Sequence, residues 1–325
     1  MKTEQNILNF LFKNGNATID EMSQKLKISR QYIHKVVKEL IDTNKIIKTG
    51  KAPHVYYKMF EKNKINNLEV LRYDTEQFLN QHFILVDALG NKLEGINAMK
   101  YWCSNQNLPF QKTTLEYVET RKKYLSHFSN THFIDGLQKL ANTNGIGKIG
   151  VDDLFYLDFY AIERFGKTRL GCLMHYAKQG QNKNLMKQIV NEITNRINNF
   201  ILTQNIDAII FVPPTINRKI QIMTFLEKEL KIELPKIIVK KISNEIIIPQ
   251  KALSKLFERV ANAKHTFIVP NQKKYNKVLI IDDAIGSGAT INEIALKIKD
   301  KKLATHIIGM AITGSYKGFE VISEI

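Results

Sequence analysis

The chain contains few of the residues that disulfide-rich, zinc-binding or membrane-spanning proteins need. Its 325 residues include two cysteines, Cys103 and Cys172, too few for a disulfide framework or a zinc knuckle. No apolar run approaches the roughly 18–20 residues of a membrane span. The first residues lack the apolar stretch of a secretory signal. We therefore expect a cytoplasmic protein with no membrane partner.

Acidic residues are also scarce relative to basic ones. The chain has 48 Lys and Arg against 31 Asp and Glu, a formal net charge of +17. Residues 1–58 contain eleven basic residues and five acidic ones. A hydrophobic share of 44% is typical of globular proteins, and the length predicts about two domains. The charge points to a polyanionic partner.

The basic N-terminal segment has the pattern of three short helices. Apolar residues at helical spacing predict a first helix that ends near Gly15. Thr18 and Glu21 have the spacing of a capping box at the start of a second helix. Ser29 occupies the N-cap position of a third helix, which we expect to run to about Asp42.

Two β-prone runs, residues 45–48 and 54–58, then predict a hairpin. Three helices followed by a basic-tipped hairpin resemble a winged helix-turn-helix, and the resemblance covers residues 1–60. In that motif the third helix enters the major groove of duplex DNA. Winged helices also serve as protein-interaction modules, but the basic polar face favours DNA. The candidate DNA-binding residues are Ser29, Arg30, Gln31, Tyr32, His34, Lys35, Lys38, Lys48 and Lys51.

Residues 61–150 have no pattern that indicates a chemistry. We expect a hairpin around Gly90 and helices over 96–106 and about 111–142, with a break near Ser129. The side chains with metal-ligand chemistry are His127, His132 and Asp135. On a polar helix such residues are more typical of a solvated face than of a metal site. We interpret this segment as a largely helical connecting region.

From residue 151 onwards, strand-like and helix-like runs alternate. Apolar runs near Asp207, Ile237, Val278 and Thr305 are typical of buried strands. Strands of this kind separated by helices predict a mostly parallel sheet covered on both faces. The predicted fold class is therefore multidomain α/β, with an N-terminal winged helix. Ligands of such sheets bind beyond the carboxyl ends of the strands.

The most informative run is Val278–Thr290, in which four apolar residues precede two acids and a loop of small residues. Backbone N–H groups of such a loop, and of the helix start after it, favour a phosphate. Asp282 and Asp283 have the chemistry to accept hydrogen bonds from a sugar diol or to hold a metal ion. A phosphate and a diol close together describe a ribose 5-phosphate.

This run resembles the phosphoribosyltransferase motif. The resemblance implies that Asp282 and Asp283 hold the ribose hydroxyls of phosphoribosyl pyrophosphate (PRPP), which binds together with Mg²⁺; the chain has no metal motif of its own. One departure is Gly286, where the family often has a hydroxyl residue. The residues implied to surround the 5-phosphate are Ala284, Ile285, Gly286, Ser287, Gly288, Ala289 and Thr290.

Other stretches resemble the ComF-like competence proteins of that family over residues 151–325, among them residues 165–178. Pro213, Pro214 and Thr215 follow the predicted strand at Asp207, where these enzymes have a loop facing pyrophosphate. The pattern from Gln250 to Phe267 is similar to that of the same family. It implies that Lys251 and Arg259 are the cationic, candidate catalytic residues.

The combination predicts a DNA-binding protein, a transcriptional regulator whose phosphoribosyltransferase-like domain binds PRPP or a nucleotide as effector. It resembles the purine-operon repressors, which pair a winged helix with the same fold. Two alternatives stay open: an active phosphoribosyltransferase, in which a nucleophile displaces pyrophosphate from PRPP, and a ComF-like DNA-uptake factor. We predict domains over 1–60, 61–150 and 151–325, and a homodimer, because winged-helix regulators often contact two half-sites.

Overall fold

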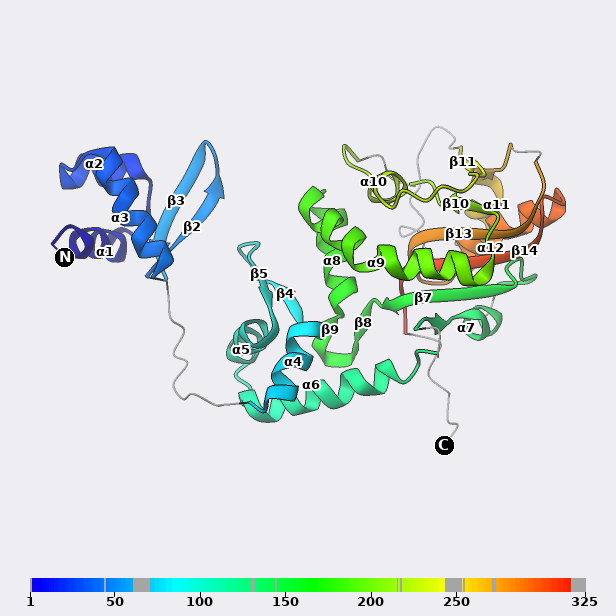
Figure 1. Ribbon diagram of the computed structural model, residues 1–325, viewed down its shortest axis with the longest axis horizontal. Helices are drawn as coiled ribbons and strands as arrows, with labels where there is room; N and C mark the ends of the chain where they lie inside the picture. Colours follow the sequence, from blue (N-terminus) through cyan, green and yellow to red (C-terminus); the bar gives the residue numbers. More distant parts are fainter. Residues whose placement is uncertain are drawn as a thin grey trace. The chain divides into compact units, whose positions relative to one another are not determined.

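The chain divides into two compact units, residues 1–69 and 70–325 (Figure 1). The computed structural model describes residues 2–43, 45–60, 71–129, 132–143, 145–214, 216, 218–242, 253, 255–270 and 273–316.

The first unit consists of three helices and a small antiparallel sheet. Its elements are α1 (Lys2–Asn14), β1 (Asn16–Ala17), α2 (Ile19–Leu26), α3 (Arg30–Asp42), β2 (Ile46–Lys51) and β3 (His54–Met59), with strand order β1-β3-β2. The capping box of Thr18 and Glu21 is present, and the Ser29 hydroxyl accepts the Tyr32 N–H at 3.4 Å. Both predicted helix starts and the hairpin are thereby confirmed.

The packing of the core of the first unit determines which side of α3 is exposed to solvent. Ile33, Val36, Val37 and Leu40 are buried on one side of α3 and pack in one cluster with residues of α1, α2 and the hairpin. The polar residues of α3 are exposed as a consequence. Burial of the apolar stripe therefore orients the basic side of α3 toward solvent.

The second unit is built around a five-stranded sheet in the order β10-β13-β14-β7-β6. The strands are β6 (Ile134–Asp135), β7 (Asp153–Phe159), β10 (Ala208–Phe211), β13 (Tyr275–Ile285) and β14 (Ala304–Gly314). Strands β10, β13, β14 and β7 are parallel, and β6 pairs antiparallel with β7. The prediction of a mostly parallel sheet is confirmed.

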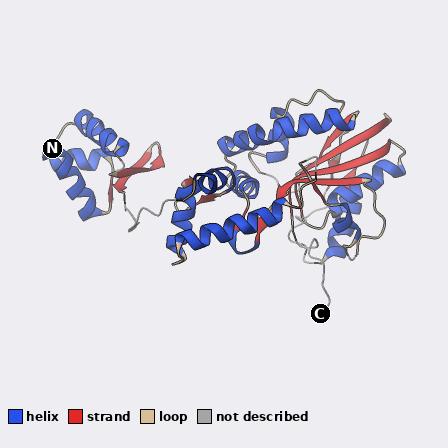
Figure 2. Cartoon of the chain, turned by 60° about the horizontal axis from the view of Figure 1, so that its bottom comes forward, coloured by secondary structure: helices blue, strands red, loops and turns tan. Residues whose placement is uncertain are grey.

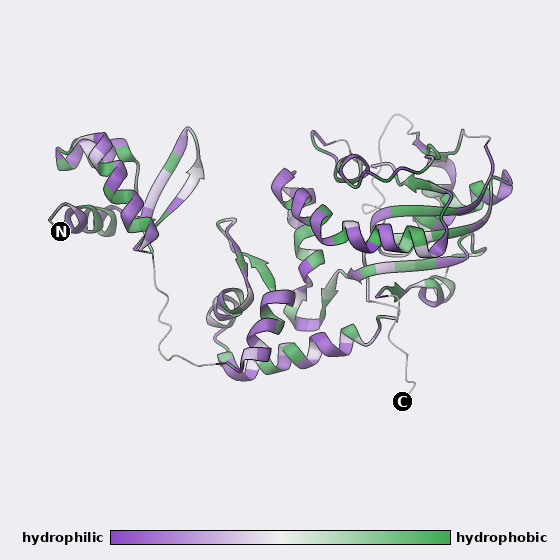
Figure 3. Ribbon diagram, viewed as in Figure 1, coloured by the Kyte–Doolittle hydropathy of each residue, from purple (hydrophilic) through white to green (hydrophobic). Residues whose placement is uncertain are grey.

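Helices cover both faces of this sheet, as Figure 2 shows. Leu279 and Ile281 pack with α8 (Arg169–Gln179), α9 (Lys183–Gln204) and α10 (Ile222–Glu229). Val278 and Ile280 pack on the other face, with α11 (Leu256–Thr266) and α12 (Ala289–Asp300). Neighbouring residues of β13 thus alternate between two cores, because side chains of a strand point to opposite faces. The apolar strands are green in Figure 3.

Residues 71–143 belong to the second unit. Their elements are α4 (Tyr73–His82), β4 (Ile84–Val86), β5 (Lys92–Glu94), α5 (Gly95–Asn105), α6 (Phe110–Leu125), β6 and α7 (Leu137–Ala141). The antiparallel pair β4–β5 confirms the hairpin predicted around Gly90. The prediction of helix up to residue 142 is wrong between α6 and α7, because Ile134 and Asp135 pair with β7 instead.

The remaining small elements lie around the main sheet. They are β8 (Ala161–Ile162), a 3₁₀ turn (Glu163–Phe165), β9 (Gly166–Lys167), β11 (Lys240–Lys241) and β12 (Phe267–Ile268). The strand expected at Ile237–Val239 is not formed. Lys236 makes a single parallel bridge to Ile209, and the chain next forms β11, which pairs antiparallel with β12 in a separate sheet.

Because of His82, at the end of α4, we expect the free energy of unfolding to decrease in acid. Burial, with the Arg121 guanidinium as a second cause, lowers the pKa of His82 from 6.5 to about 4. As pH drops, His82 is therefore protonated in the unfolded chain before it is protonated in the folded protein. The folded state loses stability as pH falls from about 6.5 toward 4. Because the imidazole is only half-buried and solvent screens its charge, the loss at pH 5 should be on the order of 1 kcal/mol. Urea unfolding of His82→Gln should show a smaller difference between pH 7 and pH 5 than the wild type; an equal difference would contradict the assignment.

Candidate functional site

The four parallel strands of the second unit end at one edge of the sheet, called the carboxyl edge below. There β13 extends beyond its neighbour β10, whose pairing stops at Phe211 opposite Ile281. Pairing with β14 continues to Ile285 opposite Gly314. Asp282, Asp283, Ala284 and Ile285 are therefore strand residues, and the loop is shorter than the sequence suggested.

The two acids at the carboxyl edge have different surroundings. Asp283 is 7% exposed and forms an ion pair with Lys178, in the last turn of α8. Asp282 is half-buried, and its Oδ1 accepts the Asp283 N–H at 2.8 Å. Strand alternation assigns Asp283 to the face covered by α8 and Asp282 to the opposite face.

A glycine loop joins β13 to α12. Gly288 has φ +79°, a left-handed backbone conformation that favours glycine, and a Cβ there would lie 2.5 Å from Leu140 Cδ1. The helix starts at Ala289. The first N–H groups of a helix have no intrahelical partner and carry the positive end of its dipole. Backbone donors next to a carboxylate pair fit a phosphorylated sugar.

Lys139, on α7, supports this loop and had not been identified from the sequence. It is 7% exposed, and its Nζ donates to the Gly286 carbonyl at 3.0 Å and the Ser315 carbonyl at 2.8 Å. Burial lowers the pKa of Lys139 to about 8. The side chain thus connects the segments that follow β13 and β14. No local pattern reveals such a contact, because Lys139 and Gly286 are 147 residues apart in the chain.

The other residues predicted for this site have mixed outcomes. The Val212 N–H donates to the Ile281 carbonyl at 2.9 Å, which brings Pro213 and Pro214 to the carboxyl edge. The Arg259 Nε donates to the Leu253 carbonyl at 2.8 Å, at the start of α11. Thr215 and Lys251 lie outside the described residues.

Two further cations at α8 were not among the predicted residues, Lys178 and Arg218. The Arg218 guanidinium donates to the Lys178 carbonyl and, at 3.1 Å, to Gln179 Oε1. Arg218 follows β10, so this contact joins the loop after β10 to the end of α8. The only sequence signal was that Lys178 ends the segment 165–178, which resembles the ComF-like family.

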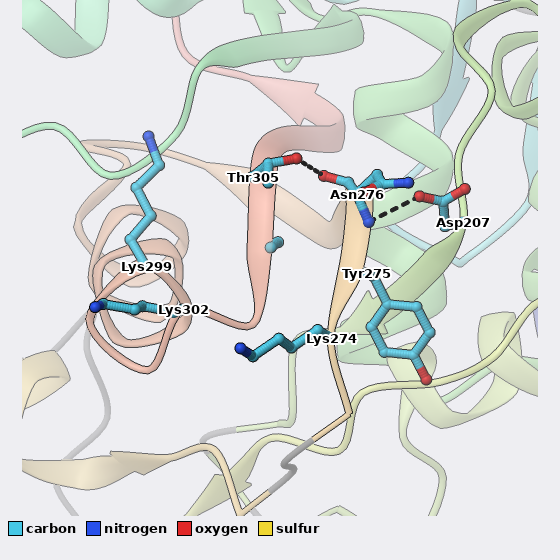
Figure 4. Close-up of a pocket in the computed structure, with 8 residues that line it drawn as sticks. Asp207, Lys274, Tyr275, Asn276, Lys299, Lys302 and Thr305 are labelled. Atoms are coloured by element: carbon cyan, nitrogen blue, oxygen red, sulfur yellow. Dashed lines mark hydrogen bonds between the residues drawn. The ribbon is translucent and has the colours of Figure 1, made fainter.

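A hollow of about 600 Å³ lies at the opposite, amino edge of the sheet (Figure 4). Asp207 in its wall already accepts the N–H groups of Asn276 and Lys277, and the Thr305 hydroxyl donates to the Asn276 carbonyl. These polar groups maintain the fold at the strand starts. Despite its volume, we regard this hollow as a weaker candidate than the carboxyl edge, where ligands of parallel sheets bind.

In the first unit, four predicted DNA-binding residues lie around one hollow. It has a volume of about 400 Å³ and lies between α3 and the hairpin. The four residues are His34, Lys35, Lys38 and Lys48. The hollow therefore has basic side chains from both α3 and β2, the two elements that contact DNA in a winged helix.

Four of the five remaining residues of the predicted DNA-binding set are near the start of α3. Ser29 has a structural role as the N-cap, and Gln31 and Tyr32 are exposed. Arg30 Nε pairs with Asp20 Oδ1 of α2 at 2.7 Å, with both side chains more than half exposed. Such an exposed pair is weak and leaves Arg30 available to a phosphate. The backbone of Lys51 is in β2.

The described part of the chain shows no cluster of three or more His, Cys, Asp or Glu side chains that could hold a metal ion. Of the three side chains considered as metal ligands, His127 instead packs against the rings of Tyr124, Phe159 and Tyr316. None of the described helices combines the length and the apolar character that crossing a bilayer requires.

Comparison with known proteins bears on the first unit. No curated protein matches the chain. Residues 2–47 match the family model described as winged helix-turn-helix DNA-binding. This match covers α1 to the start of β2, and its description agrees with the observed helix order and exposed basic α3. The first unit is therefore a winged helix-turn-helix module, similar to those that bind DNA.

Proposed function

We propose that the protein is a DNA-binding transcriptional regulator whose second unit binds PRPP or a nucleotide as effector. The observation that carries this proposal is the carboxyl edge, where Asp282 and Asp283 directly precede a glycine loop at the start of α12. The same run resembles the phosphoribosyltransferase motif in sequence. DNA binding through α3 and the hairpin is supported by the family match and by the basic hollow.

The proposed ligand chemistry follows from the donors and acceptors at this edge. The carboxylates of Asp282 and Asp283 accept hydrogen bonds from the ribose hydroxyls. The N–H groups of the glycine loop and of the first turn of α12 donate to the 5-phosphate. Mg²⁺ would enter with the ligand and screen its diphosphate charge, and the same two carboxylates are the nearest candidates to hold it.

Regulation requires that the ligand and DNA affect each other's affinity. A ligand shifts an equilibrium only by its unequal affinity for two states of the protein. If DNA changes the affinity for the ligand by some factor, the ligand changes the affinity for DNA by the same factor, since coupling is reciprocal. In the proposed regulator, saturating PRPP therefore changes the dissociation constant for duplex DNA.

Titration calorimetry with PRPP and Mg²⁺ on the full chain tests the proposed site. We expect wild-type protein to bind, and Asp282→Asn/Asp283→Asn to bind about 100-fold more weakly, because hydrogen bonds to charged acceptors are lost. Asp300→Asn, at the far end of α12, is the control and should bind as the wild type does. Wild-type protein that binds neither PRPP nor a nucleotide would refute the effector role.

The same protein also allows a test of the enzymatic alternative. Fluorescence anisotropy with a labelled DNA duplex, measured with and without PRPP, reports regulation directly. Release of pyrophosphate from PRPP in the presence of a purine, pyrimidine or amine acceptor would instead identify a phosphoribosyltransferase. Unchanged DNA affinity together with pyrophosphate release would replace the proposed regulation by catalysis.

A further inference from the structure

Asp283, which the proposed function assigns to a ribose hydroxyl, already forms an ion pair with Lys178. Lys178 is in the last turn of α8, and the side chains of Lys178 and Asp283 are 29% and 10% exposed. An almost buried carboxylate needs a partner, because an unpaired buried charge is costly. The ammonium group of Lys178 is that partner.

The backbone of Lys178 is held in place independently of this ion pair. The Arg218 guanidinium donates to the Lys178 carbonyl, and Gln181 Oε1 accepts the Ile220 N–H at 2.8 Å. These contacts fix the end of α8 against the loop after β10. The Lys178 side chain can therefore change partner by rotation alone, with its main chain fixed.

The position of Lys178 also separates it from the glycine loop. Lys178 approaches β13 from the face covered by α8, whereas α12, whose first turn follows the loop, covers the opposite face. A 5-phosphate bound at the start of α12 is thus served by backbone donors. A second anionic group of the same ligand, on the other side of the sugar, would meet the Lys178 ammonium.

We propose that Lys178 determines specificity for sugar phosphates that carry a diphosphate, by exchanging Asp283 for that diphosphate when a ribose hydroxyl binds Asp283. This inference rests on the proposed function, because it assumes that the carboxyl edge binds a phosphorylated ribose. After the exchange Lys178 still has an anionic partner, and Asp283 accepts a hydrogen bond from the ribose hydroxyl. A ligand without the diphosphate displaces Lys178 from Asp283 and offers no replacement, so it binds weakly.

Three probes distinguish this role from a purely structural one: PRPP, ribose 5-phosphate and inorganic pyrophosphate, each with Mg²⁺, titrated into the full chain. Lys178→Met should weaken binding of PRPP and pyrophosphate by about 10- to 100-fold. The same variant should bind ribose 5-phosphate more tightly than the wild type, because Asp283 no longer has a competing partner. Asp283→Asn should show the reverse pattern, with tighter pyrophosphate and weaker ribose 5-phosphate binding.

The controls separate the possible outcomes. Lys183→Met removes an exposed charge at the start of α9 and should not change any of the three affinities. If Lys178→Met fails to fold, Lys178→Arg is the substitute variant. It keeps the positive charge and should retain PRPP binding within a few fold. Equal weakening of all three probes by Lys178→Met, or no change in pyrophosphate binding, would overturn the role of Lys178. Wild-type protein that binds none of the probes would instead refute the proposed function.

Discussion

Replacing Arg121 with methionine is expected to lower the free energy of unfolding of the second unit by about 3–5 kcal/mol. The Arg121 guanidinium, on α6, binds both carboxylate oxygens of Asp158 on β7, at 2.9 and 2.7 Å, and both side chains are buried. Without Arg121 the Asp158 carboxylate remains buried and unpaired. Chemical denaturation of the wild type and the variant measures the difference.

Two further variants test whether the buried charge is the cause. Asp158→Asn, added to Arg121→Met, removes the second charge but keeps an acceptor for the Phe159 N–H, which bonds Asp158 Oδ1 at 2.8 Å. This double variant should recover most of the lost stability. Lys123 is on the same helix as Arg121. Lys123→Met breaks its exposed ion pair with Glu163 and should have no measurable effect. A double variant as unstable as Arg121→Met would show that packing, rather than charge, is responsible.

Removal of three lysines around the hollow of the first unit is expected to weaken binding to duplex DNA by about 100-fold in low salt. Lys35, Lys38 and Lys48 are the lysines there, and all three are exposed. Each lysine that neutralises a phosphate releases counterions. The plot of log K against log salt should therefore be less steep for the triple Lys→Gln variant, with a slope smaller in magnitude by about 2.7. Anisotropy titrations of the full chain over a range of salt concentrations measure both quantities.

The matched control removes the same number of charges elsewhere in the same unit. It combines Lys13→Gln, Lys25→Gln and Lys27→Asn, where asparagine suits the left-handed backbone of Lys27 at φ 55°. This variant should retain both the affinity and most of the salt slope of the wild type. If the two triple variants weaken binding equally, the effect comes from net charge, and the face formed by α3 and the hairpin is not the DNA-binding surface.

The sequence by itself determined the winged helix and the type of sheet. The caps at Thr18 and Ser29 and the buried stripe of α3 arise from residues three or four positions apart. The apolar runs of β10, β13 and β14 needed no more than their own composition to be identified as buried strands. Such features depend on neighbours in the chain, so a local pattern is sufficient to predict them.

The tertiary structure alone decided which side chains meet at the carboxyl edge. Lys178 and Asp283 are 105 residues apart in the chain, Lys139 and Gly286 are 147 apart, and Arg121 and Asp158 are 37 apart. The sequence had identified Asp283 and Gly286 but not their partners, and had left residues 61–150 without a role. Contacts of this kind depend on how the elements pack, and packing follows from the burial of whole faces rather than from the spacing of any short motif.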